Sequence, residues 1–163
     1  MFWLLCAAFA AESPELPDWT VTVDPLTTAL GYVHLQTERV LSSHTSIYAG
    51  PHLRLFDGLL TEGREPFVGI GGEAGFRYFP WGKAPTGGWV MARGVLARLA
   101  TTEAPKTAEA GGYGSALVGY TGIVGKHFVL SGGLGFQYLA YDIQGYGSSG
   151  PFPAAHTNLG VAF

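Results

Sequence analysis

Apolar and polar side chains alternate with a period of two along most of this chain. Residues 128–141, for example, place Leu130, Leu134 and Phe136 on one face and Ser131 and Gln137 on the other. Successive side chains of a β-strand point to opposite faces, so this period predicts strands with one apolar and one polar face. Comparable stretches occupy residues 26–40, 47–55, 67–79, 89–101, 111–124 and 155–163. We therefore expect an all-β protein.

An eighth strand is expected near the start of this region. The seven stretches above are an odd number, whereas a membrane barrel with both chain ends on one side needs an even number of strands. The sequence "DWTVTVD" supplies the missing strand at residues 18–24, with Thr20 and Thr22 alternating against two valines. Asp24 and Pro25 would then form the first turn, because proline presets the backbone for a turn.

Composition distinguishes a membrane barrel from a soluble one. Only 13% of the residues are charged and 47% are hydrophobic, yet no apolar run is long enough for a transmembrane helix. The lysines at positions 83, 106 and 126 all fall in connections. Short connections (41–44, 80–88, 125–127) also alternate with long ones (57–66, 101–112, 142–152). These features predict an eight-stranded antiparallel up-and-down transmembrane β-barrel over residues 19–163.

The first residues have the character of a targeting segment. Residues 1–10 are apolar and end in Ala8-Phe9-Ala10, which predicts a signal peptide, and residues 11–18 form a Pro-rich leader. The signal lacks a basic residue before its apolar run, so we expect that the true start could lie upstream of Met1. Cleavage after Ala10 would remove Cys6 and leave no thiol chemistry. The net charge of −3, without a basic run, argues against nucleic acid as a partner.

Two stretches carry a resemblance to a known group. "GFRYFP" at the end of one strand and the terminal "HTNLGVAF" resemble the small bacterial outer-membrane β-barrel proteins that include the OmpA membrane domain and OmpX. In that group the last strand ends on an aromatic residue, with apolar residues two and four positions before it, and the barrel assembly machinery reads this mark. The matching residues here are Leu159, Val161 and Phe163. The glycine common five positions before the end is Asn158 here, so no subfamily is implied. The resemblance implies a monomer in the outer membrane that contacts lipid.

The polar faces predict what lies inside the barrel. An eight-stranded barrel is only wide enough to be filled by side chains, so we expect a closed lumen and not an open porin. Charges removed from water need partners, which predicts an ion-pair network. We expect Arg77 to pair with Glu73 and Arg54 with Glu38. The predicted lumen residues are His34, Glu38, His52, Arg54, Glu73, Arg77, Arg93 and Gln137.

One charged residue does not fit the alternation. Arg98 falls on the apolar face of its stretch, which indicates either a β-bulge or the edge of the membrane.

These features favour a structural or surface-interaction protein that is not an enzyme and has no cofactor or metal site. One alternative is a lipid A modifying enzyme, because His44 and Ser46 have the His-x-Ser spacing of a lipid A deacylase family. A turn between two strands explains the same residues more simply. A second alternative is a soluble lipocalin-like barrel that binds an apolar ligand in an apolar interior.

Overall fold

In the computed structural model, the described residues are 16–54, 67–101, 108–143 and 146–163. The predicted signal peptide and most of the leader lie outside them. The strands are β1 (Trp19–Val23), β2 (Tyr32–Ser42), β3 (Thr45–Arg54), β4 (Phe67–Lys83), β5 (Thr86–Thr101), β6 (Ala108–Val124), β7 (Phe128–Ile143) and β8 (Tyr146–Ala162). A short helix, α1 (Pro25–Ala29), lies between β1 and β2. Within the described ranges, no helix is long and apolar enough to cross a membrane.

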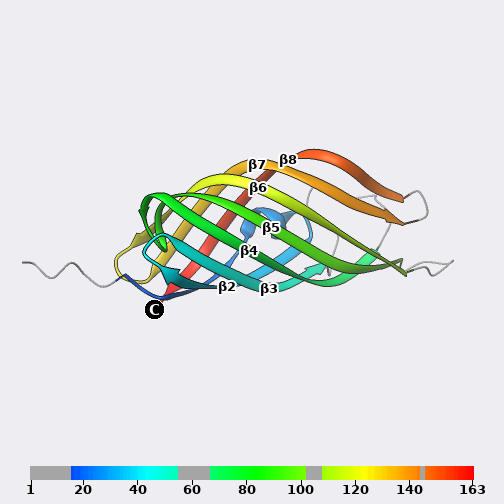
Figure 1. Cartoon of the computed structure of the whole chain (residues 1–163). Coiled ribbons are helices and arrows are strands. Elements are labelled where there is room, and N and C mark those ends of the chain that lie inside the picture. Colours follow the sequence, from blue (N-terminus) through cyan, green and yellow to red (C-terminus); the bar gives the residue numbers. More distant parts are fainter. Residues whose placement is uncertain (1–15, 55–66, 102–107, 144–145) are drawn as a thin grey trace, which may run out of the picture.

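The strands form one closed barrel. Each strand pairs antiparallel with the next one along the chain, and β8 pairs with β1 (Figure 1). The last residue takes part in this closure, because Phe163 and Trp19 exchange backbone hydrogen bonds of 2.9 and 3.0 Å. The predicted first strand and the eight-stranded antiparallel up-and-down fold are confirmed. We call the end of the barrel that holds Trp19 and Phe163 the terminal end, and the opposite end the loop end.

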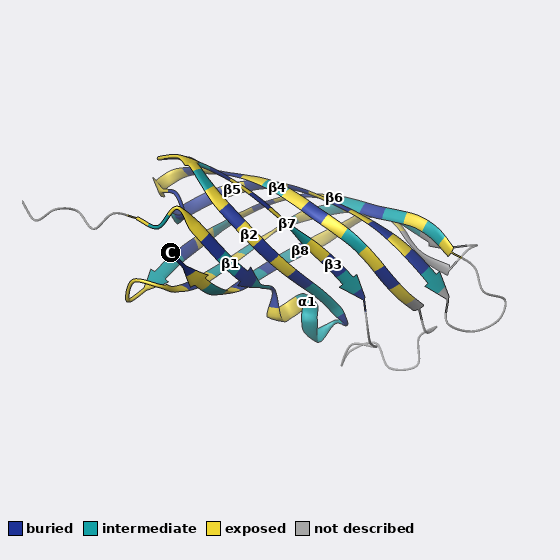
Figure 2. Ribbon diagram, turned by 90° about the horizontal axis from the view of Figure 1, so that it is seen from below, coloured by how far each residue is buried: buried dark blue, intermediate teal, exposed yellow. Residues whose placement is uncertain are grey.

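Buried and exposed residues alternate along the strands, as Figure 2 shows. In β5 the odd-numbered residues from Trp89 to Leu99 are buried, and the even-numbered residues from Val90 to Arg98 are exposed. Arg98 pairs with Ile70 in an unbroken register. No bulge is therefore present at Arg98, and this side chain belongs to the outer face of the barrel.

The connection between β1 and β2 differs from the expected turn. A strand was expected from Leu26 onward, but the chain forms α1 instead (Figure 2). Asp24 is the N-cap, because its Oδ1 accepts hydrogen bonds from the backbone N–H groups of Leu26 and Thr27 at 3.0 and 3.1 Å. Pro25 lies in the first turn, where a helix needs no N–H. A helix of little more than one turn is too short to show its own periodicity in the sequence.

The strands have unequal lengths. β1 has 5 residues, whereas β4 and β8 have 17 each. The expected long connection at 142–152 is wrong, because β7 continues to Ile143 and β8 already begins at Tyr146. The Gly, Ser and Pro residues of this stretch suggested a loop, but such residues are tolerated in a strand that has a free edge. The expected connection at 57–66 lies outside the described residues. The connection expected at 101–112 is shorter than predicted, because β5 ends at Thr101 and β6 already begins at Ala108.

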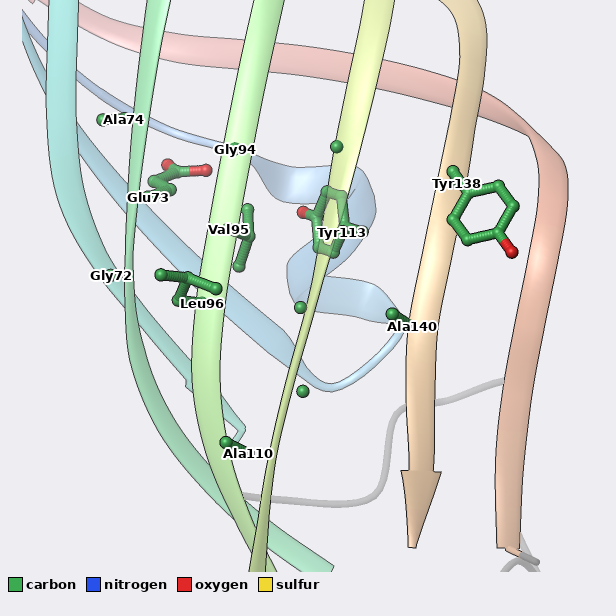
Figure 3. A pocket seen from close by; sticks show the side chains of 13 residues that line it. Gly72, Glu73, Ala74, Gly94, Val95, Leu96, Ala110, Tyr113, Tyr138 and Ala140 are labelled. Carbon is green, nitrogen blue, oxygen red and sulfur yellow. The ribbon is translucent and has the colours of Figure 1, made fainter.

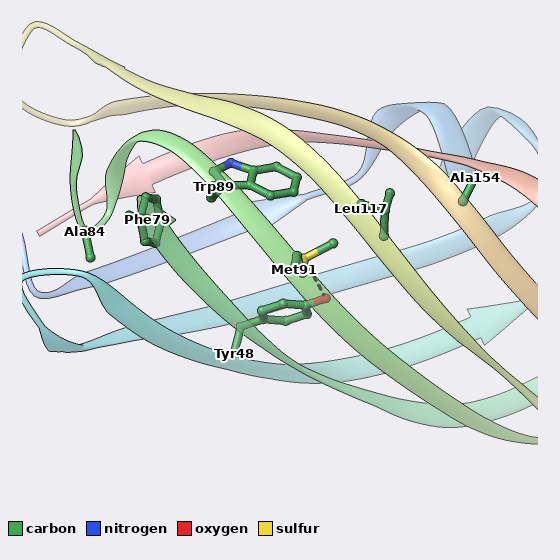
Figure 4. Packing of buried hydrophobic residues seen from close by; sticks show 7 residues of the cluster. All are labelled: Tyr48, Phe79, Ala84, Trp89, Met91, Leu117 and Ala154. Carbon is green, nitrogen blue, oxygen red and sulfur yellow. Dashed lines mark hydrogen bonds between the residues drawn. The ribbon is translucent and has the colours of Figure 1, made fainter. Parts of the chain in front are cut away.

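An apolar cluster lies inside the barrel toward its terminal end. Its members are Tyr48, Phe79, Ala84, Trp89, Met91, Leu117 and Ala154 (Figure 4). The polar atoms of its aromatic residues have partners: Trp89 Nε1 donates to Thr121 Oγ1 at 2.9 Å, and the Tyr48 hydroxyl donates to the Met91 sulfur at 3.3 Å. The barrel therefore has an apolar layer beside the polar residues described next.

Candidate functional site

The predicted polar set lies inside the barrel. Seven of the eight predicted lumen residues are buried, with at most 5% of their surface exposed: His34, Glu38, His52, Arg54, Glu73, Arg77 and Arg93. Gln137 is half-buried. It lies on the inner face because it pairs with Ser115, whose hydroxyl accepts a hydrogen bond from Arg93 Nε at 3.2 Å.

Among the described residues, the shortest ion pair of the interior joins β4 to β2. Arg77 Nη1 donates to Glu38 Oε2 at 2.6 Å. The Arg77 guanidinium also lies 5.1 Å from the ring centre of Tyr48 and 5.0 Å from that of Trp89. Glu38 accepts a further hydrogen bond from the hydroxyl of Ser46. Additional contacts of this kind compensate for the loss of water around a buried ion pair.

A second group surrounds Glu73. His34 Nδ1 lies 2.9 Å from Glu73 Oε2, and His52 Nδ1 lies 2.9 Å from His34 Nε2. An ionised carboxylate can only accept, so His34 donates through Nδ1 and, when neutral, accepts through Nε2. His52 must then donate through Nδ1, which leaves Nε2 of a neutral His52 as an acceptor. Arg93 Nη1 lies 3.9 Å from Glu73 Oε2 and completes the group.

Both expected ion pairs are wrong in their pairing. Arg77 contacts Glu38, and Glu73 contacts His34, although Arg77 and Glu73 lie four positions apart on one strand. Arg54 pairs in register with Tyr32 and donates to its hydroxyl at 2.8 Å, well away along β2 from Glu38. Sequence spacing gave the correct face of each strand but not the partner across the barrel.

Asp24 connects α1 to β8 and is fully buried. Its Oδ1 accepts from the Thr157 hydroxyl at 2.7 Å, and its Oδ2 lies 3.3 Å from His156 Nδ1. His156 Nε2 lies 3.0 Å from Arg77 Nη2. Arginine can only donate, so the shorter of two guanidinium contacts makes this nitrogen an acceptor and directs the Nδ1 hydrogen at Asp24. Arg93 Nη1, which lies 3.3 Å from the same Nδ1, then makes no hydrogen bond to it. His156 thus links Asp24 to the pair of Arg77 and Glu38.

Sequence reasoning missed Asp24 and His156. Counting Asp24, the described interior holds three buried carboxylates and three buried guanidiniums: Asp24, Glu38, Glu73, Arg54, Arg77 and Arg93. The prediction had two carboxylates against three guanidiniums. An Asp followed by Pro is typical of an N-cap and first helical position, and this signal could have found Asp24. His156 is on the polar face of the last stretch, which could have added it to the lumen set.

The structure does not assemble the His-x-Ser pair considered for catalysis. Ser46 is buried and donates to Glu38. His44 is exposed in the turn between β2 and β3, where its Nδ1 lies 2.8 Å from the Ser43 hydroxyl. The two residues therefore belong to different environments.

The outer face of the barrel is apolar. Each of the following side chains is at least 63% exposed: Ile70, Trp81, Leu96, Tyr120, Leu134, Phe136 and Phe163. This arrangement is the reverse of a lipocalin-like barrel, which has an apolar interior and a polar surface. A shallow hollow crosses the outer face of β4 to β7, between Leu96 and Tyr138 (Figure 3). Its lining consists largely of glycine and alanine.

Neither a metal centre nor a relative identifies the site. In the part of the chain that the structure describes, no group of His, Cys, Asp and Glu side chains could hold a metal ion. Comparison with protein-family models, with curated proteins and with solved structures finds no match.

Proposed function

We propose that the chain is a small bacterial outer-membrane β-barrel with a closed interior and a structural or surface-interaction role. The single observation that carries this proposal is the distribution of side chains between the two faces. Outward positions such as Leu96 and Phe136 are 78% and 74% exposed, whereas Arg77 and Glu38 are buried inside. An apolar outer band with polar residues inside is typical of a barrel surrounded by lipid.

The interior contacts support a closed barrel. Charged side chains from β2, β4, β5 and β8, together with Asp24, contact one another across the barrel interior. The apolar cluster around Trp89 lies beside them, with Trp89 itself 0% exposed. Eight-stranded barrels leave room for side chains and not for a wide channel. A stable open pore is therefore not expected.

Cell fractionation tests the location. In bacteria that have an outer membrane, the full chain should stay in the membrane fraction after a carbonate wash. It should also migrate differently on a detergent gel before and after heating, as a closed membrane barrel does. Release of the protein by osmotic shock without detergent would contradict the membrane proposal.

A pair of arginine substitutions makes this test specific to lipid. Leu134→Arg places a charge on the outer face near the middle of β7, where Leu134 is 68% exposed, and should cost about 2–4 kcal/mol in a bilayer. Ala108→Arg places the same charge at the loop end of β6 and should cost about 0–1 kcal/mol. We expect lower membrane insertion for Leu134→Arg alone, and equal insertion of both variants would contradict an outer face that contacts lipid.

Conductance tests the closed interior. The purified barrel in a planar bilayer should give no sustained current steps. A steady open channel in the wild-type protein would contradict the proposal of a closed lumen and leave the membrane location intact.

A further inference from the structure

The barrel wall has a free edge along β8. β8 pairs with β7 from Tyr146 to Val161, but it pairs with β1 only from Leu159 to Ala162. On the β1 side, the described residues of β8 before Leu159 have no neighbouring strand. They meet α1 instead, where the Leu26 N–H donates to the Thr157 hydroxyl at 3.2 Å. Among the described residues, no strand pairs with β8 on this side above α1, and we call this break in the pairing between β8 and β2 the gap in the wall.

The free edge is built so that it does not need a strand partner. The Thr157 N–H points away from β7, because it donates to Asp24 Oδ2 at 3.4 Å. Alternate residues of a strand direct their N–H groups to the same side, so Pro151 and Pro153 would direct theirs to the free edge as well. Proline has no N–H, and the β7–β8 pairing passes both prolines without interruption. At these two positions the edge therefore has no donor that a membrane would leave unsatisfied.

Register shows which side chains lie behind this edge. Gln137 pairs with Ser115 on one side and with Phe152 on the other. Cross-strand partners lie on the same face, and Ser115 contacts Arg93 inside the barrel, so Phe152 also points inward. Leu139 and Tyr141 share this face, two and four positions after Gln137 in the same strand.

The inner surface behind the edge is accessible. Phe152 is 38% exposed although it points inward, and Leu139 and Tyr141 are half-buried. Toward the terminal end the interior differs, because Trp89 and His156 are 0% exposed. The accessible inner surface lies beside the gap in the wall and is lined mainly by apolar and aromatic side chains.

A row of aromatic rings extends from this surface to His52, whose side chain has a polar atom without a hydrogen-bond partner among the described residues. Tyr141 lies 6.1 Å from Tyr113, Tyr113 lies 6.3 Å from His52, and His52 stacks on Tyr32 at 5.5 Å between ring centres. His52 is 1% exposed, and its Nε2 has no hydrogen-bond partner among the described residues. When His34 and His52 are both neutral, the hydrogen bonds that run from Glu73 through His34 make this nitrogen an acceptor. A buried acceptor of this kind requires an O–H or N–H donor.

We propose that this inner surface binds one long acyl chain that ends in a carboxyl group, and that the chain enters sideways through the gap beside β8. The carboxyl O–H donates to His52 Nε2, and the acyl chain lies along Leu139, Tyr141 and Phe152. The inference rests on the proposed outer-membrane location, because a free fatty acid would dissolve in the lipid around the outer face and reach the gap from there.

Binding in detergent micelles tests this site on the whole folded barrel. A dansyl-labelled undecanoic acid reports occupancy, and palmitic acid and methyl palmitate compete with it. Palmitic acid should compete about tenfold better than the methyl ester, because the ester lacks the O–H and leaves His52 unpartnered. The variant His52→Phe should remove this preference. A preference for the acid that survives His52→Phe would overturn the role of His52.

Two neighbouring positions on β7 provide a matched control. Leu139→Trp fills the inner surface with a larger ring. The variant should bind the acid at least about tenfold more weakly, because the ring occupies space that the acyl chain would use. Ala140→Trp adds the same ring on the outer face and should leave binding unchanged. Equal effects of both variants, or a larger effect of Ala140→Trp, would overturn the site, and this comparison decides the matter if His52→Phe does not fold.

The outcomes separate this inference from the proposed function. The heat-dependent gel shift verifies that each variant forms a closed barrel before binding is measured. A membrane-embedded barrel without saturable acid binding would overturn the acyl-chain site and leave the membrane location standing. A barrel that binds the acid but is released from cells without detergent would overturn the membrane location and leave the acyl-chain site standing.

Discussion

Arg77 Nη1 lies 2.6 Å from Glu38 Oε2, although these residues belong to β4 and β2, which are separated by β3. The ion pair therefore crosses the barrel interior instead of bridging two adjacent strands. Both side chains are at most 5% exposed, so the charges depend on each other for compensation.

We expect strong coupling between Arg77 and Glu38. Arg77→Met or Glu38→Leu alone should lower the free energy of unfolding by about 3–5 kcal/mol, because each leaves a buried charge unpaired. The double variant should lose less than the sum of the two single losses. Unfolding by guanidinium in detergent, measured for the wild type, the two single variants and the double variant, completes this double-mutant cycle. Additive losses would mean that the pair does not act as a unit.

The partner of Arg77 illustrates what sequence can and cannot reveal. The period of two put Arg77 and Glu38 on inward faces correctly, because each strand obeys its own alternation. Which inward residues meet depends on how far each strand is staggered around the barrel, and this stagger is a property of all eight strands. Glu73, four positions away in sequence, was therefore a reasonable but wrong partner.

Asp24 shows a second limit. The Asp-Pro pair correctly indicated that β1 would end here, but nothing local indicated that Thr157 and His156 would reach the same carboxylate. The free edge of β8 was missed for the same reason. Gly, Ser and Pro in residues 147–153 predict a loop when read locally, whereas the absence of a neighbouring strand makes them suitable for an edge.

Asp24 should stabilise the barrel where β1 ends. Asp24→Ala removes the helix cap and leaves His156 and Thr157 without their acceptor, so it should lower the free energy of unfolding by about 2–4 kcal/mol. Asp24→Asn keeps a capping oxygen and should cost about half as much. Asp18→Ala, at an exposed position just before β1, is the control and should stay within about 0.5 kcal/mol of wild type. A loss for Asp24→Ala no larger than the control's would argue against this role.

Gly119 should be far less tolerant of a methyl group than Gly94. A Cβ at Gly119 would lie 2.3 Å from the Gly132 carbonyl oxygen and 2.4 Å from the Trp89 ring, whereas a Cβ at Gly94 would meet nothing within 4 Å. Gly119→Ala should therefore lower the free energy of unfolding by about 1–3 kcal/mol through overpacking. Gly94→Ala should be nearly neutral. Denaturant titrations of the two variants side by side give the comparison, and equal stabilities would show that the barrel relaxes around Trp89.

Phe163 is expected to matter for assembly more than for stability. Its side chain is 63% exposed, and its backbone forms the hydrogen bonds to Trp19 that close the barrel. Phe163→Ala keeps those backbone bonds and loses only the partly buried ring, a cost of about 1 kcal/mol or less. If Leu159, Val161 and Phe163 form an assembly signal, the variant should nevertheless accumulate outside the membrane in cells. It should refold normally into detergent micelles.

The control for Phe163 is Phe136→Ala, which removes a 74% exposed ring from the outer face of β7 without touching the last strand. A burial effect alone predicts similar behaviour of the two variants in cells, because both rings are largely exposed. A recognition effect predicts that only Phe163→Ala fails to insert, since the assembly machinery would read the end of the chain. The membrane-inserted fraction in cells, measured beside the refolded yield in micelles, separates the two. Normal insertion of Phe163→Ala would show that this ring is not part of an assembly signal.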